Sequence, residues 1–338
     1  MTASSVIPML TMNNGTQLPI LGLGTGISRG SNDKVMVEDA VYTAVAAGYR
    51  LIDTAWKYGT EQEVGRGISR AISEGICKRD DIVVITKVWS TQFSAQSVRK
   101  AAQVSNKNLQ LGHIDVMLLH FPIPVMDVPG SPFPLMDDGL TLAVDESIDI
   151  FTETWPAMEQ LVHEGITRSI GVSNFPSALV EKLMTTATIM PVINQVESHP
   201  LLPQTKLIEV CNKYGIIVMA HSPFAGSPRP QPDGSIGPSP LKSKLFQNEL
   251  LKELALKYDK SVAQILLKFH VTRGVCVIPK SVRKDNIEQN LQLFDFDLLN
   301  SEMDHLLLLA TGERKIQIPA LRKTKYSSYM DLFESDCH

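Results

Sequence analysis

Four residues of this chain carry side chains that can polarise a carbonyl group and protonate its oxygen: Asp53, Tyr58, Lys87 and His120. The pKa of a free tyrosine is about 10, and a cation such as Lys87 beside it lowers this pKa by stabilising the phenolate. Asp53 can hold Lys87 charged and in place, while His120 can donate a hydrogen bond to a carbonyl oxygen. The four would then act as a general acid for a carbonyl that accepts a hydride.

A hydride donor must complete this chemistry. Side chains cannot supply hydride, so the four residues require a nicotinamide cofactor. Each residue alone also has a structural interpretation: a buried acid, a packing tyrosine, an ion-pair partner and a hydrogen-bonded core histidine. The functional interpretation therefore depends on whether the fold brings the four together.

The positions of these residues in the chain indicate that the fold brings them close together. Asp53, Lys87 and His120 each end a short apolar run, and Tyr58 follows Asp53 in a small loop. Polar residues end four further runs, at Ser173-Asn174, Gln195, His221 and Lys280-Ser281. If the runs are parallel strands, all these residues meet at one edge of the sheet.

Eight such apolar runs alternate with helical patterns, which predicts a parallel sheet. The runs are rich in Ile, Val and Leu with little alternation, as in strands buried on both faces. They lie near residues 21–24, 51–53, 82–87, 116–120, 169–172, 192–196, 216–220 and 275–279. A doubly wound sheet and a closed barrel both fit this repeat, but eight βα units in about 300 residues favour an α/β fold of the (β/α)8 TIM barrel type.

Helical patterns fill the intervals. They cover residues 33–47, 95–108, 204–214, 261–272 and 301–310, and a further helix begins at Thr60. We expect Ser94 to cap the second of these helices, and Thr60 to form a capping box with Glu63. Residues 8–19 are expected to form an N-terminal β-hairpin with a type I′ turn at Asn14-Gly15, which closes the bottom of the barrel.

We expect one barrel domain over residues 1–338, with three long segments added to it. Residues 121–149 and 224–241 exceed ordinary loop length and follow predicted strands, so they are expected on the C-terminal face as substrate loops. The structural alternative is that they are surface linkers. Residues 312–338 form a C-terminal tail.

Composition argues against several classes of protein. The formal net charge is −4, so no basic surplus indicates a nucleic-acid partner. The sequence has no signal-peptide pattern, no membrane-spanning apolar run and no HExxH-type metal motif. The four cysteines show neither close pairing nor metal spacing, which is typical of reduced thiols. We therefore expect a cytoplasmic monomer without a membrane partner or a catalytic metal.

Six motifs resemble those of the aldo-keto reductases, in the family's order and spacing. They are GYRLIDTAWKYGTEQEVGRGI, VVITKVW, LQLGHIDVMLLHFP, ITRSIGVSNF, PVINQVESHP and VIPKS, and the match runs from about Thr11 to Gly312. The resemblance implies a (β/α)8 barrel that binds NADP(H) in an extended form and reduces an aldehyde or ketone to an alcohol. It also implies that the four residues above are catalytic, with Tyr58 as the proton donor.

The resemblance further implies a cofactor site at the strand ends. Ser173, Asn174 and Gln195 would hold the nicotinamide carboxamide, and the segment that begins at Ser222 would follow the pyrophosphate. The GLGTG run at residues 22–26 lacks the spacing of a Rossmann fingerprint, so we expect it to be a turn near the ribose. The expected cofactor contacts are Gly24, Thr25, Ser173, Asn174, Gln195, His221, Ser222, Phe224, Lys280, Ser281, Val282, Arg283, Asn286, Gln289 and Asn290.

The substrate pocket is expected to be aromatic. Trp56, Trp89 and Phe121 flank the catalytic residues in sequence and are the candidate substrate contacts. Phe133, Phe224, Tyr326, Tyr329 and Phe333 are further candidates from the long segments, with simple packing as the alternative for each. Such a pocket favours a hydrophobic small-molecule carbonyl substrate, ketosteroids included.

Two positions depart from the family pattern. His221 stands where the family commonly has a tyrosine stacked on the nicotinamide, and imidazole offers a smaller stacking area. If protonated, His221 would disfavour the positively charged NADP⁺ relative to NADPH; comparing the pH profiles of both dissociation constants with those of His221→Tyr tests this hypothesis. Asn286 stands where the family often has an arginine at the 2′-phosphate, with Arg283 and Lys284 as candidates to substitute. NADPH is therefore the expected cofactor, with NADH as a weaker alternative.

Two other functions compete with carbonyl reduction. One is a cofactor-binding regulatory or structural barrel with little turnover, against which the intact set of four residues argues. The other is reduction of an enone double bond, which in this family goes with a changed residue at the histidine. His120 is retained, so carbonyl reduction is favoured.

Overall fold

The protein is a closed barrel of eight parallel strands. The computed structural model describes residues 7–27, 34–226, 229–230, 236–237, 239–314 and 324. The barrel strands are β3 (Leu23–Gly24), β4 (Leu51–Asp53), β5 (Val83–Val88), β6 (Ile114–Leu119), β7 (Thr167–Ser173), β8 (Ile193–Glu197), β9 (Ile217–His221) and β12 (Cys276–Val277). They pair in chain order, and bridges from Leu21 to Val277 and from Gly24 to Lys280 join the two ends of the sheet. The predicted fold is confirmed, and each predicted strand end lies within two residues of the observed one.

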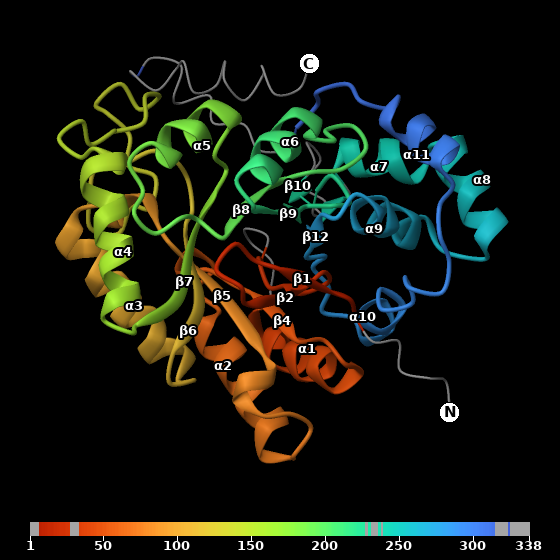
Figure 1. The fold of residues 1–338 in the computed structure, drawn as a ribbon, viewed down its shortest axis with the longest axis horizontal. Coiled ribbons are helices and arrows are strands. Elements are labelled where there is room, and N and C mark those ends of the chain that lie inside the picture. Colours follow the sequence, from red (N-terminus) through yellow and green to blue (C-terminus); the bar gives the residue numbers. More distant parts are fainter. Residues whose placement is uncertain are drawn as a thin grey trace.

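Helices surround the strands. Figure 1 shows them ringed around the barrel, as expected for a chain whose strands are apolar on both faces. They are α1 (Lys34–Ala47), α2 (Glu61–Ser73), α3 (Ala95–Leu109), α4 (Trp155–His163), α5 (Ser177–Met184), α6 (Thr205–Lys213), α7 (Pro240–Phe246), α8 (Glu249–Tyr258), α9 (Val262–Thr272), α10 (Lys284–Gln289) and α11 (Asn300–Leu307). None of the helices in the described ranges is long and apolar enough to cross a membrane.

The N-terminal hairpin closes the bottom of the barrel. Strands β1 (Met9–Thr11) and β2 (Gln17–Pro19) are antiparallel. Met12 and Leu18 belong to the same buried cluster as the inward-facing residues of the barrel strands. The predicted type I′ turn is wrong. Only Gly15 has a positive φ, of 84°, and its N–H donates to Met12 O, so the hairpin has a three-residue turn that ends in a left-handed glycine.

Two predicted helix starts have different outcomes. Ser94 caps α3 as predicted, because its side chain accepts a hydrogen bond from Ser97 N. The capping box at the start of α2 is wrong, since Thr60 makes no side-chain cap. Thr60 is buried, and its hydroxyl lies 3.4 Å from that of Thr54. Burial against the preceding loop therefore takes the side chain away from the helix terminus.

The long segments after β6 and β9 lie on the C-terminal side of the barrel. Residues 121–149 fold on themselves through bridges such as Val125–Val144 and Leu135–Leu142. The second segment, residues 224–241, differs from the expected loop because part of it is regular structure. It contains the paired strands β10 (Arg229–Pro230) and β11 (Ile236–Gly237), and α7 begins inside it at Pro240. Most of the tail, with Tyr326, Tyr329 and Phe333, lies outside the described residues.

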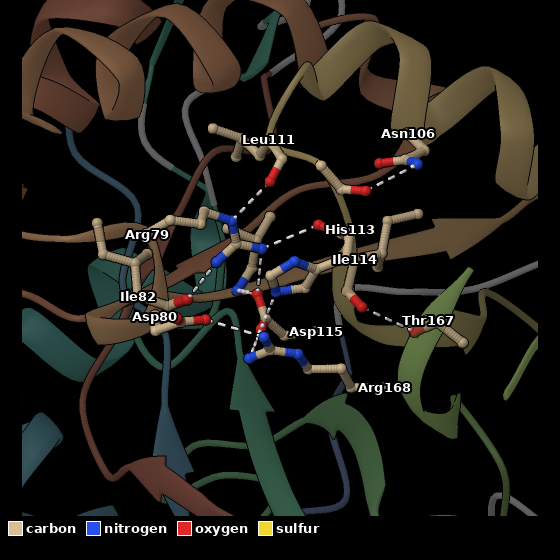
Figure 2. Close-up of polar contacts among 12 residues, drawn as sticks. Arg79, Asp80, Ile82, Asn106, Leu111, His113, Ile114, Asp115, Thr167 and Arg168 are labelled. Carbon is tan, nitrogen blue, oxygen red and sulfur yellow. Dashed lines mark hydrogen bonds and ion pairs between the residues drawn. The ribbon is translucent and has the colours of Figure 1, made fainter. Parts of the chain in front are cut away.

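A polar cluster holds together the opposite, N-terminal face of the barrel. Arg79 precedes β5 and donates to Asp115 Oδ2 on β6 at 2.7 Å, and also to three backbone carbonyls. Asp115 also accepts from Val84 N at 2.9 Å, and its Oδ1 lies 3.1 Å from His113 Nε2. Figure 2 shows Arg168 from β7 completing the cluster through ion pairs with Asp115 and Asp80. Three neighbouring strands are thus tied together at their starts.

Candidate active site

A cavity of about 470 Å³ opens at the C-terminal ends of the barrel strands. Its volume lies within the range of small-molecule binding sites. Most of the predicted site residues line it: Gly24, Asp53, Tyr58, His120, Phe121, Ser173, Asn174, Gln195, His221, Ser222, Phe224, Lys280, Ser281, Val282, Arg283 and Asn286. The predicted convergence of the strand-end residues on one mouth is therefore observed.

A buried ion pair lies beneath the cavity wall. Lys87 Nζ on β5 lies 2.9 and 2.7 Å from the two carboxylate oxygens of Asp53 on β4, and 2.9 Å from Thr54 O. Lys87 is fully buried. Burial alone would lower the pKa of Lys87, but the charge of Asp53 and the contact with Tyr58 raise it above its ordinary value. Lys87 is thus held as an ammonium group.

Tyr58 lies between this ion pair and the cavity. It ends the single turn η1 (Trp56–Tyr58) that follows β4, and Lys87 Nζ is 5.2 Å from the centroid of its ring. The prediction that its pKa is lowered is wrong for the free protein. Burial raises the pKa of Tyr58, and the nearby charge of Lys87 opposes this shift without reversing it. Tyr58 is therefore a protonated phenol at neutral pH, the form that a proton donor needs.

His120 forms a second side of the site. Its ring meets that of Tyr58 edge-on, with the centroids 5.7 Å apart. Burial, with the positive charge of Lys87 next in size, holds the pKa of His120 well below its ordinary value, so the ring is neutral. Its Nδ1 is buried without a hydrogen-bond partner among the described residues. A neutral ring carries one N–H, which can donate to a carbonyl oxygen.

Aromatic side chains support His120. Phe121 stacks on it, with the ring planes 11° apart, and Trp89 meets it edge-on at 4.9 Å. Phe133, from the segment after β6, packs on Trp89, whose indole N–H donates to Pro132 O. Trp89 is only 3% exposed and does not line the cavity, so it supports the wall from behind.

A hydrogen-bonded chain of polar side chains forms the third side. Gln195 Nε2 donates to Asp53 Oδ2 at 2.7 Å, and Ser173 Oγ donates to Gln195 O. Asn174 Nδ2 donates to His120 O at 2.9 Å, and Asn174 Oδ1 lies 3.4 Å from His221 Nε2. The side chains predicted to hold a carboxamide are thus connected to the ion pair.

The backbone of this wall is unusual at two points, and a third, Gly26, leaves room for the phenol. Asn174 and Ser222 have positive φ angles of 61° and 53° although neither is glycine, a costly conformation that concentrates at functional sites. Gly26 faces the tyrosine: a Cβ atom there would lie 3.4 Å from Tyr58 Cζ. Any larger side chain at position 26 would fill the space beside the phenol.

A cationic arm continues the cavity away from Tyr58. We use this name for Lys242, Lys280 and Arg283, which line the cavity together with the neutral Asn286. Among the described residues that line the cavity, Asp53 is the only acid, and it is already bonded to Lys87 and Gln195. This part of the cavity therefore suits a ligand with negative groups.

Several predicted site residues lie outside the cavity wall. Thr25 lies in a small neighbouring pocket and donates to Asp53 O. Gln289 and Asn290, at the end of α10, do not line the cavity, and neither does the half-buried Trp56. Lys284, a candidate to replace an arginine at 286, instead lies 3.7 Å from Glu288 on the outer side of α10.

Three further lining residues belong to segments expected at the site: Gly26 in the run 22–26, and Pro223 and Gly226 in the segment that begins at Ser222. Ile27, Lys242 and Ile278 also line the cavity, although the sequence did not indicate them as site residues. Lys242 has no comparable sequence signal, because it lies just after the expected loop 224–241, on a helix that the sequence did not predict. No group of side chains that could hold a metal ion occurs in the part of the chain that the structure describes.

Comparisons with known proteins agree with this geometry. The sequence profile of the Aldo/keto reductase family matches residues 20–307. The chain is 36% identical over 325 residues to an NAD(P)H-dependent D-xylose reductase of Candida tropicalis, covering 93% of this chain and 96% of that one. It is similar to the crystal structure of a Bombyx mori aldo-keto reductase in complex with NADP, with a TM-score of 0.80, 39% identity and coverage of 92% and 95%. An aldose reductase structure from Schistosoma japonicum gives a TM-score of 0.83 at 34% identity, with coverage of 94% and 97%.

Proposed function

The chain belongs to the aldo/keto reductase family, and we propose that it reduces an aldehyde or ketone to an alcohol with NADPH, using Tyr58 as the proton donor. The observation that carries this proposal is the buried Lys87–Asp53 pair beside the protonated phenol of Tyr58, at the wall of a cavity. The relatives are NAD(P)H-dependent reductases or were crystallised with NADP, which supports the cofactor.

Each of the four residues Asp53, Tyr58, Lys87 and His120 has its own role in the proposed reaction. When bound, the nicotinamide supplies the hydride. The His120 N–H and the Tyr58 O–H would both point at the carbonyl oxygen and stabilise the negative charge that develops on it. Tyr58 then gives its proton to that oxygen, and the ammonium of Lys87 stabilises the phenolate that is left. Asp53 acts as a positioning residue that keeps Lys87 charged and in place.

The cavity wall fits the parts of a dinucleotide. Gln195, Ser173 and Asn174 would orient the nicotinamide amide, with His221 beside it. The cationic arm would hold the phosphates at the adenosine end, with Arg283 as a cation close to the 2′-phosphate. The net positive charge of this arm supports NADPH as the preferred cofactor and NADH as the weaker one.

We propose hydrophobic aldehydes or ketones, ketosteroids included, as the substrate class. Phe121 lines the mouth, and Trp89 and Phe133 form an aromatic wall behind it. The segment after β6 adds exposed apolar side chains such as Leu135, Met136 and Leu140. The names of the relatives favour a second candidate, an open-chain aldose such as D-xylose.

A cytoplasmic monomer is the form we propose for the protein. The cysteines in the described ranges, Cys77, Cys211 and Cys276, are buried and form no disulfide, which supports a compartment that keeps thiols reduced. Gel filtration coupled to light scattering tests the oligomeric state, and a dimer would contradict it.

A screen of NADPH oxidation against aldehydes, D-xylose, quinones and ketosteroids tests the reaction and its substrate class. We expect turnover with NADPH, with one class exceeding the others by more than about tenfold in kcat/KM, which is about 1.4 kcal/mol of transition-state binding. Tight NADPH binding without turnover of any carbonyl would instead support a cofactor-binding barrel with no reductase activity.

A further inference from the structure

Lys242 reaches the cavity from an element separate from the other cations. It lies on α7, while Lys280 and Arg283 lie between β12 and α10. All three line the same cationic arm. A ligand in this arm would therefore be contacted from two sides, by groups that are about 40 positions apart in the chain.

Aromatic rings hold the ammonium group of Lys242. Its Nζ lies 5.9 Å from the centroid of Phe224 and 5.1 Å from that of Phe246. The N-terminal turn of α7 is fixed by Ser239, whose hydroxyl donates to Ala225 O at 2.7 Å and accepts from Lys242 N at 3.1 Å. The side chain is therefore positioned by aromatic contacts and by its helix.

Six other lysines in the C-terminal third of the chain form ion pairs with carboxylates, whereas no described acid pairs with Lys242. Among the residues that the structure describes, ion pairs join Lys244 to Glu313, Lys252 to Glu249, Lys257 to Glu302, Lys260 to Asp295, Lys268 to Asp297 and Lys284 to Glu288. No such pair joins Lys242 to an acid within those residues. Burial and then the positive charge of Lys280 lower the pKa of Lys242, so an anion between the two lysines would be favourable.

Position 286 explains why a further cation is needed. Asn286 lines the cationic arm but carries no charge. Lys284 is 71% exposed and paired with Glu288, so it does not replace a cation there. Without Lys242, the positive charge that the described lining residues supply to this end of the cavity would come from Lys280 and Arg283 alone.

We propose that Lys242 binds the adenosine 2′-phosphate of NADPH together with Lys280 and Arg283, in place of a cation at position 286. This inference rests on the proposed function, because it requires that the cavity takes NADPH. Charge-assisted hydrogen bonds to phosphate are strong, and NADH lacks this phosphate. Lys242 is therefore a residue that determines the preference for NADPH over NADH.

Calorimetric titration of Lys242→Met tests the inference without any turnover. Dissociation constants are measured for NADPH, NADH and adenosine 2′,5′-bisphosphate. We expect the constants for NADPH and the bisphosphate to rise about tenfold to a hundredfold, the range for one charged hydrogen bond. The constant for NADH should stay within about twofold. Lys244→Met, two residues further on the same helix, is the matched control and should change none of them.

A rescue variant separates a direct contact from a general effect on the fold. Adding Asn286→Arg to Lys242→Met should restore much of the NADPH affinity, because it returns a cation to the arm. Equal weakening of NADPH and NADH would place Lys242 at a group that both cofactors share and overturn the inference, as would unchanged binding of both. If the wild-type protein bound neither cofactor, the proposed function itself would be contradicted, and this inference with it.

Discussion

Two buried ion pairs lie at opposite ends of the same barrel strands. Asp53 and Lys87 meet at the C-terminal ends of β4 and β5. Arg79 and Asp115 meet at the N-terminal ends of β5 and β6, with His113 beside them (Figure 2). Both pairs are 2.7 Å long and largely buried. A search for buried charges in the structure would therefore find both.

The surroundings of the two pairs differ. The partners of Arg79 and Asp115 are other parts of the barrel: three carbonyls, the amide of Val84, the guanidinium of Arg168 and the imidazole of His113. His113 can titrate, but it does not line the cavity. The titratable neighbour of the Asp53–Lys87 pair, the phenol of Tyr58, does line it, and so does Asp53 itself. A buried ion pair alone thus indicates only a fixed charge; a titratable neighbour on a cavity indicates that the charge takes part in chemistry.

Removing the cation of the Asp53–Lys87 pair should have the largest effect on catalysis. We expect Lys87→Met to lower kcat/KM for NADPH-dependent reduction about a thousandfold, because the Tyr58 phenolate loses its stabilising charge. Steady-state NADPH oxidation measures this loss. Arg79→Met, the equivalent change in the Arg79–Asp115 pair, should keep kcat/KM within about twofold of the wild-type value. A Lys87→Met variant with more than a tenth of wild-type activity would remove the distinction between the two pairs.

Breaking the Arg79–Asp115 pair should have the opposite effect: the protein should lose stability but keep its activity. Asp115→Asn keeps the shape of the side chain but leaves the guanidinium group of Arg79 without its carboxylate, while Arg168 keeps its ion pair with Asp80. Removing one partner of a buried pair costs about 3 kcal/mol, so the free energy of unfolding in urea should fall by about that amount. The folded variant should keep wild-type kcat/KM. A loss of activity without a loss of stability would mean that this face also serves the reaction.

His113 gives a smaller, pH-dependent comparison. Burial, followed by the charge of Arg79, lowers the pKa of His113 in the folded state. The unfolded chain then binds more protons than the folded one as the pH falls through about 6.5, so this group destabilises the fold on acidification. His113→Gln can still donate to Asp115 but does not titrate. Its loss of melting temperature from pH 7.5 to 5.5 should be smaller than that of the wild type, and equal losses would refute the contribution.

The sequence predicts the cavity end of the barrel well, for a physical reason. In a parallel barrel all strands end on one face, so a polar residue after each apolar run must converge with the others. Asp53, Tyr58, His120 and Gln195 follow this rule, and all of them line the cavity. Lys87 lies just behind the wall, bonded to Asp53.

Features that depend on packing were not predictable in the same way. Lys242 reaches the cavity only because α7 folds back after β9, and no local pattern marks that path. Thr60 fits a capping motif, but its side chain is buried against Thr54 instead. The pKa of Tyr58 depends on how deeply the ring is buried, which the neighbouring sequence does not reveal.

Tyr58→Phe is the most direct test of Tyr58 as the proton donor, because it removes one hydroxyl and leaves the ring in place. Two quantities are compared with the wild type: the dissociation constant for NADPH and kcat for reduction of the best carbonyl substrate. NADPH binding should stay within about twofold while kcat falls about a hundredfold to ten-thousandfold, the range for one general acid. A variant that retains more than a tenth of wild-type kcat would contradict the assignment of Tyr58 as the proton donor.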